Sequence, residues 1–140
     1  MRLAHEQAQP RPDKSVISWI GRIDLDHLFT SSLNIAELRL GVLKKVTISD
    51  AHLLTLWIEN TVRPWFENRV IEIGEAAFLR WRVLARHMEV KQLPAPAVDL
   101  LIAATALEHG LHVATRDVKP FVGSGIPVLN PWTGERFNGA

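Results

Sequence analysis

The stretch that decides the fold spans residues 93–107 and reads LPAPAVDLLIAATAL. After its two prolines it is apolar on nearly every face of a helix, which is typical of a helix inside a protein. The single acid in this stretch is Asp99. Because an isolated buried charge is very costly, its carboxylate must be paired, hydrogen-bonded or bound to a metal ion. The stretch therefore predicts a buried helix that carries one constrained acid.

A second acid lies in the next segment, GLHVATRD at residues 110–117. Gly110 is typical of a helix end, and residues 111–115 are typical of a short strand. Asp117 comes just after that strand. We expect the rest of the chain to be arranged around Asp99 and Asp117.

Short apolar segments alternate with helical patterns along the chain. Strands are predicted at 28–33, 70–73, 111–115 and 126–130, and helices near 16–20, at 35–45, from 49 or 50 towards Pro64, at 75–90 and around Asp99. This alternation is typical of an α/β protein with a parallel sheet. In such sheets the ligand site lies beyond the carboxyl ends of the strands.

A third acid, Glu37, follows the first predicted strand. Asn34 is expected to cap the next helix, with Glu37 three residues later as in a capping box. Because Glu37 and Asp117 both follow strands, we expect them on one edge of the sheet, with Asp99 pointing towards that edge. Oxygen ligands of this kind are the ones that Mg²⁺ prefers.

Each acid also has an ordinary structural explanation. Glu37 suits a capping box, Asp99 suits the positive end of a helix dipole, and Asp117 suits a turn or an N-cap. These structural roles do not exclude metal binding. The functional interpretation is favoured because three independent segments are predicted to bring their acids to one edge.

Composition limits the remaining classes. The chain has 140 residues, 47% of them hydrophobic, a formal net charge of +1 and no cysteine. These values predict one globular domain without disulfides, in which any polyanion must bind to a local patch. No apolar run approaches the roughly 18 residues of a membrane span, and residues 1–14 lack the apolar core of a signal peptide.

Other motifs are weaker. The chain has no HExxH, GxGxxG or Walker A pattern, which argues against a small-molecule α/β domain with a nucleotide site. The histidines at 52, 87 and 109 are expected to be exposed helix residues. The most basic helix carries Arg80, Arg82, Arg86 and Lys91. By default we interpret these charges as a solvent-exposed face of the helix. Contact with RNA is the less favoured interpretation. Two interpretations remain open for Trp57 and Trp65: they pack in the core, or they form part of a dimer or partner surface.

Four segments in order resemble a known family. They are NIAELRLG at 34–41, VDLLIAATA at 98–106, ATRD at 114–117 and PVLNPW at 127–132. Together they resemble a PIN domain, specifically the VapC/FitB-like toxins of bacterial type II toxin–antitoxin pairs, over about residues 11–132. The resemblance implies a three-layer α/β/α fold with a short parallel sheet, in a single domain that covers residues 1–140.

The resemblance also implies an activity. Members of the family are Mg²⁺- or Mn²⁺-dependent ribonucleases, and Glu37, Asp99 and Asp117 match acidic positions that hold the metal and serve catalysis. Thr115 matches the hydroxyl residue that supports the acids. The implied partners are an RNA substrate, a second copy of the chain and a small antitoxin with a DNA-binding domain. A cytoplasmic location is implied, whereas the RNA target and the residues that bind RNA are not.

The start of the chain departs from the family pattern. The family opens with a buried strand ending in Asp-Thr-Asn, and counting back from residues 11–13 places that acid at or before Met1. The domain is therefore expected to be incomplete at its N-terminus. Either the start codon is assigned too late, or the gene is a decayed toxin that lacks a metal ligand. The second explanation predicts an alternative function, a catalytically inactive PIN-domain protein that binds an antitoxin without cleaving RNA.

Overall fold

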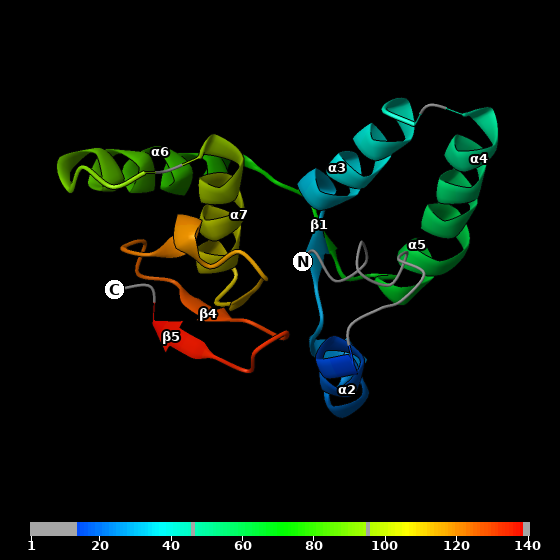
Figure 1. The fold of residues 1–140 in the computed structure, drawn as a ribbon. Helices are drawn as coiled ribbons and strands as arrows, with labels where there is room; N and C mark the ends of the chain where they lie inside the picture. Colours follow the sequence, from blue (N-terminus) through cyan, green and yellow to red (C-terminus); the bar gives the residue numbers. More distant parts are fainter. Residues whose placement is uncertain (1–13, 46, 95, 139–140) are drawn as a thin grey trace. The chain divides into compact units, whose positions relative to one another are not determined.

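The structure is a computed structural model that describes residues 14–45, 47–94 and 96–138, and its chain forms two compact units, Met1–Glu72 and Ile73–Ala140. The first unit contains α2 (Lys14–Arg22), η1 (Leu25–His27), β1 (Thr30–Ser31), α3 (Ser32–Leu43), α4 (Ile48–Trp57), the π-helix η2 (Ile58–Val62), α5 (Arg63–Trp65) and β2 (Val70–Ile71). The second contains α6 (Glu75–Val90), α7 (Ala97–Glu108), β3 (Val113–Ala114), η3 (Lys119–Phe121), β4 (Pro127–Leu129) and β5 (Arg136–Asn138) (Figure 1).

The strands confirm the predicted mixed α/β class. In the first unit β1 pairs with β2 in parallel, and in the second unit β3 pairs with β4 in parallel. The described strands thus form two short sheets, of two and three strands, where the sequence predicts one. The strand β5 pairs antiparallel with β4 and is not among the predicted strands. Its three residues, RFN, are too short and too polar to show strand periodicity.

The helix α3 begins earlier than predicted. Its N-cap is Ser31, whose Oγ accepts a hydrogen bond of 3.2 Å from the backbone N–H of Asn34 and donates one of 2.5 Å to Asn34 Oδ1. Asn34 therefore lies buried in the first turn instead of capping it. The predicted capping box is wrong, because Glu37 lies a full turn beyond the position from which it could reach the N-cap.

The helix α4 also starts before its predicted cap at Ser49 or Asp50. Thr47 is the N-cap, since its Oγ1 accepts a 3.1 Å hydrogen bond from the backbone N–H of Asp50. From α4 the chain continues through the π-helix η2 into α5, which ends at Trp65. Pro64 limits the helix as predicted, but the π-helical segment before it was not indicated by the sequence.

In the first unit Arg69 joins the strand pair to the end of α5. Its guanidinium donates to the carbonyl oxygens of Leu28 and Trp65 and forms an ion pair with Asp26. The Leu28 bond is 3.0 Å long, and the Arg69 side chain is mostly buried. The Arg69 carbonyl oxygen also accepts from the N–H of Thr30. Arg69 therefore links the residues just before β1 to the residues just before β2.

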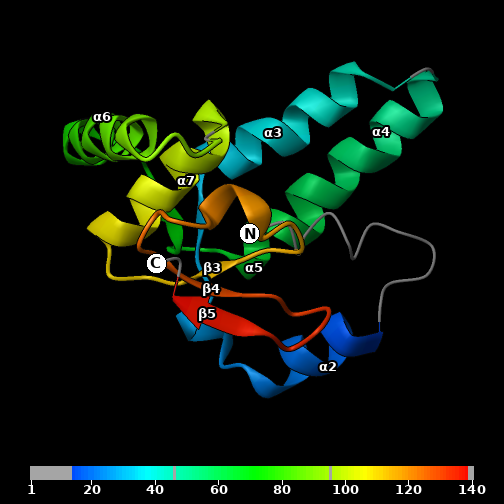
Figure 2. The ribbon, with the colours of Figure 1, turned by 60° about the vertical axis from the view of Figure 1, so that its left-hand side comes forward.

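In the second unit α7 lies on one side of the sheet and packs across α6 (Figures 1 and 2). Six of its twelve residues are buried: Leu100, Ile102, Ala103, Ala104, Thr105 and Ala106. The predicted core helix is thereby confirmed. From α6, the buried residues that complete this core are Ala77, Leu84 and Met88. Among the described residues, no helix is both long and apolar enough to span a membrane.

We predict that Arg69→Ala lowers the free energy of unfolding by roughly 2 kcal/mol, because the carbonyl oxygens it satisfies lose a charged donor. Urea unfolding followed by circular dichroism measures this change. Arg86→Ala is the matched control, since Arg86 and its partner Glu89 are both largely exposed and such pairs contribute little. Equal stability of Arg69→Ala and wild type would contradict the structural role.

Candidate functional site

Asp99 lies in the first turn of α7, and its side chain is half-buried. The neighbouring residue Leu100 is almost fully buried, which anchors this end of the helix. No side chain caps α7, whose N-cap is Pro96. An acid in this turn is favoured by the positive end of the helix dipole. The position therefore places a carboxylate at the margin of an apolar core.

The strand β3 returns along α7. The chain reverses at Gly110, whose φ is +64°, and the N–H of Leu111 donates to the carbonyl oxygen of Ala106. About 14 Å of helix rise separates Asp99 from the end of α7, and residues 111–115 cover about 13 Å of extended chain. Because these two lengths are similar and β3 contacts α7, we expect the residues after β3 to lie near the level of the first turn of α7.

Asp117 follows β3 in the second unit, and its side chain is exposed. Thr115 is buried, and its N–H donates a 3.0 Å hydrogen bond to the carbonyl oxygen of Leu129 in β4. The hydroxyl of Thr115 donates to the carbonyl oxygen of Asp117 at 3.3 Å. Thr115 therefore constrains the backbone of the acid, and its side chain does not contact the carboxylate itself in any described hydrogen bond.

Asn130 is a second support of this loop that sequence reasoning missed. It is buried, its Nδ2 donates to the carbonyl oxygen of Arg116 at 3.5 Å, and its Oδ1 accepts from the N–H of Trp132 at 2.9 Å. Its N–H donates to the carbonyl oxygen of Glu135. The only sequence signal was the PVLNPW segment, which does not by itself indicate which of its residues reaches back to the acid.

Glu37 belongs to the first unit, where it lies exposed in α3. Asp99 and Asp117 belong to the second unit. Within the part of the chain that the structure describes, no three side chains of His, Cys, Asp or Glu are grouped closely enough to hold a metal ion. The three-acid cluster on one edge therefore stays a prediction. The donor set itself fits a hard divalent cation, since all three groups offer carboxylate oxygens.

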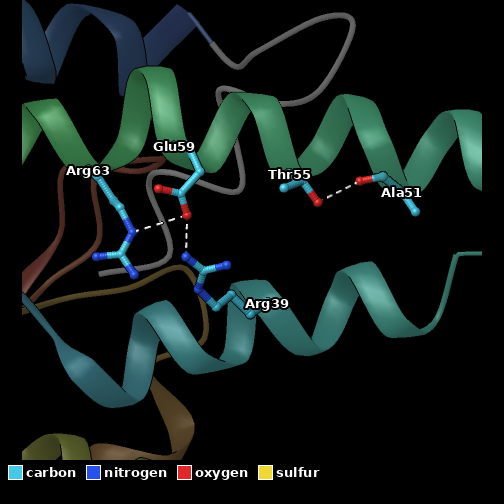
Figure 3. A network of polar contacts seen from close by, with 5 residues as sticks. All are labelled: Arg39, Ala51, Thr55, Glu59 and Arg63. Atoms are coloured by element: carbon cyan, nitrogen blue, oxygen red, sulfur yellow. Dashed lines mark hydrogen bonds and ion pairs between the residues drawn. The ribbon is translucent and has the colours of Figure 1, made fainter.

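Near Glu37, polar contacts join α3 to the long helical segment opposite (Figure 3). The carboxylate of Glu59 in η2 pairs with Arg39 of α3 and, at 3.3 Å, with Nε of Arg63. All three side chains are largely exposed, so each pair contributes little to stability. Thr55 Oγ1 donates to the carbonyl oxygen of Ala51. Of these contacts, the Arg39–Glu59 pair joins the two helical segments, and the other two lie within the α4–η2–α5 segment.

A groove of about 410 Å³ lies between α3 and α4. Its lining residues are Ala36, Arg39, Leu40, Val42, Leu43 and Thr55. Because this lining contains no carboxylate, the groove does not offer the ligands of a metal centre. Its mostly apolar surface is suited to apolar side chains.

The secondary candidates keep their ordinary interpretations. The histidines at 52, 87 and 109 are exposed, as predicted. The basic face of α6 is also exposed, and two of its arginines form ion pairs, Arg80 with Glu108 and Arg86 with Glu89. Gly123 has a φ of +82°, and a Cβ there would collide with the side chain of Leu93, so this position favours glycine. Trp57 and Trp65 are half-buried, which is compatible both with core packing and with a partner surface.

The sequence and the fold both match a known family. A model of the PIN domain matches residues 8–121, and the chain belongs to the PIN-domain family. Within it the chain is similar to the toxin FitB of Neisseria gonorrhoeae, with 31% identity over 127 residues and 91% of each chain covered. It is 31% identical to the VapC ribonuclease Y4jK of Sinorhizobium fredii over 121 residues, 86% of each chain.

Solved structures agree with this assignment. The crystal structure of FitAcB from Neisseria gonorrhoeae matches with a TM-score of 0.88, at 30% identity and over 94% of each chain. The predicted PIN fold and the predicted similarity to VapC/FitB-like toxins of toxin–antitoxin systems are therefore confirmed.

We predict that Asn130→Ala destabilises the second unit by about 1–3 kcal/mol, because a partly buried carbonyl oxygen and a backbone N–H both lose their partner. Thermal or urea unfolding of the full chain checks this. Asn60→Ala, at an exposed helical position, is the control and should be neutral or slightly stabilising, since alanine favours helix. An Asn130 variant as stable as wild type would show that the loop does not depend on this side chain.

Proposed function

We propose that this chain is a divalent-metal-dependent endoribonuclease and the toxin component of a type II toxin–antitoxin system. The observation that carries the proposal is the position of two acids on adjoining elements: Asp99 lies in the first turn of α7, and the exposed Asp117 follows β3, which contacts α7. Membership of the PIN-domain family supports it, as does a relative named a ribonuclease.

The residues proposed to hold the ion are Glu37, Asp99 and Asp117, and we infer that it is Mg²⁺ or Mn²⁺. When bound, such an ion acidifies a water molecule and stabilises negative charge on a phosphodiester. In this account the acids act as ligands and not as nucleophiles. Thr115 is a positioning residue, because it constrains the backbone of Asp117. The buried body of α7 keeps Asp99 at a constant place in its first turn.

The proposed partner is a small antitoxin with a DNA-binding domain that blocks the site. The support for it is the similarity to FitB within the FitAcB structure. We also propose a homodimer and a cytoplasmic site of action, where RNA and antitoxin are both available. The family makes a tRNA anticodon loop or an rRNA site a candidate target.

The direct test compares wild type with Asp99→Asn in cleavage of bacterial tRNA and rRNA. The wild type should cleave in Mg²⁺ or Mn²⁺ and stop when EDTA is added. Asp99→Asn should cleave at least about 100-fold more slowly, since even the outer partners of metal ligands affect activity by 10–100-fold. Glu89→Gln, an exposed acid on α6 that pairs only with Arg86 among the described contacts, is the control and should cleave like wild type.

Two results would contradict the proposal. Full activity of a correctly folded Asp99→Asn variant would remove Asp99 from the site. A wild-type chain that binds an antitoxin tightly but leaves RNA intact in Mn²⁺ would favour the inactive binding protein instead.

A further inference from the structure

Arg116 lies between the buried Thr115 and the proposed metal ligand Asp117, and its backbone is held on both sides. On one side Thr115 N–H bonds to β4, and on the other the Arg116 carbonyl oxygen accepts from Asn130 Nδ2. These two hydrogen bonds constrain the position of the Arg116 Cα atom, from which its side chain projects. Its position relative to Asp117 is therefore constrained.

The Arg116 side chain is exposed, and its guanidinium carbon lies 5.8 Å from the centroid of the Trp132 ring. This is the geometry of a cation–π contact. Trp132 is itself anchored, because its N–H donates to Asn130 Oδ1. The same buried asparagine thus holds the backbone of the arginine and the ring on which its head group rests.

Arginines elsewhere in the structure are mostly engaged with carboxylates. Arg39, Arg63, Arg69, Arg80 and Arg86 all form ion pairs. Among the described residues no carboxylate lies within ion-pair distance of Arg116, although it is adjacent in sequence to an exposed acid. A guanidinium resting on an aromatic face keeps planar N–H donors available at its edges, and these match the geometry of a phosphate.

We propose that Arg116, supported by Trp132, binds a backbone phosphate of the RNA substrate beside the acidic site. The inference rests on the proposed function, which makes RNA the ligand that approaches Asp117. Acidic ligands of a metal repel a polyanion, so a cation next to them lowers the electrostatic cost of bringing RNA there. Lys119, which is also exposed two residues beyond Asp117, adds charge of the same sign. A carboxylate of an antitoxin is an alternative ligand for Arg116. The experiment below separates the two because it measures RNA binding directly.

Arg82 provides a matched control on another element. It is an exposed arginine of α6 whose guanidinium lies 5.7 Å from the centroid of the Trp81 ring. It shares the charge and the aromatic support of Arg116 and differs in its distance along the chain from the acids. A general effect of surface charge on RNA binding would therefore appear in both variants.

The experiment measures binding of a fluorescein-labelled, mixed-sequence, single-stranded RNA of about 20 nucleotides by fluorescence anisotropy. It uses the full chain in EDTA, where no cleavage occurs, across 50–300 mM KCl. Arg116→Ala should bind at least about 10-fold more weakly at 100 mM KCl, as expected for the loss of a charge-assisted contact. The slope of log K against log salt should become shallower by about 0.7, the value for one phosphate on a single strand.

The companion variants sharpen the result. Arg116→Lys should keep the wild-type salt slope, because the charge remains, and should recover only part of the affinity, because the planar donor pair is lost. Arg82→Ala should leave both affinity and slope unchanged. Arg116→Ala binding within twofold of wild type would overturn the inference, whatever it does to antitoxin binding. Equal losses in Arg116→Ala and Arg82→Ala, or no RNA binding by wild type, would overturn it as well.

Failure of this inference and failure of the proposed function give different results. If wild type cleaves RNA in Mn²⁺ and Arg116→Ala binds RNA normally, the ribonuclease stands and the role of Arg116 is wrong. If Arg116→Ala loses RNA affinity while wild type cleaves nothing in Mn²⁺, the phosphate contact stands and the ribonuclease proposal is wrong.

Discussion

Burial of the apolar helix α7 is the constraint on which the second unit depends. Half of its residues are buried, α6 packs across it, and β3 runs back along it. Because a helix apolar on nearly all faces is stable only when covered, the surrounding elements must enclose it. Asp99 lies near the start of this helix, and Asp117 follows the strand that comes after it.

The loop that carries Asp117 depends on polar contacts made by buried side chains. The side chains of Thr115 and Asn130 bond to backbone groups of residues 116, 117 and 132, and the backbone N–H of Thr115 bonds to residue 129. Satisfied buried polar groups are costly to disturb, so they give a short loop a defined conformation. The rigidity that a metal site and a phosphate contact both need is thus supplied by residues that touch neither ligand.

The sequence predicted what periodicity and propensity govern. The core helix at 97–108, the long helix at 75–90 and the parallel strand pairs all follow from apolar patterns. It could not predict which of several polar residues caps α3, because Ser31 and Asn34 are both good caps and the extended backbone at Ser31 decided the matter. It also missed Asn130, since a contact across fourteen residues leaves no local pattern. The proposed grouping of Glu37 with the other acids would likewise leave no local pattern, because these residues lie far apart in the sequence.

The most direct test of the account is the location of Mn²⁺ in crystals of the full chain, by anomalous diffraction. The account predicts Mn²⁺ bound by carboxylate oxygens of Glu37, Asp99 and Asp117, at distances of about 2.1 Å, close to those of Mg²⁺ sites. Mn²⁺ bound elsewhere, or no Mn²⁺ at these carboxylates at a concentration that supports RNA cleavage, would contradict it.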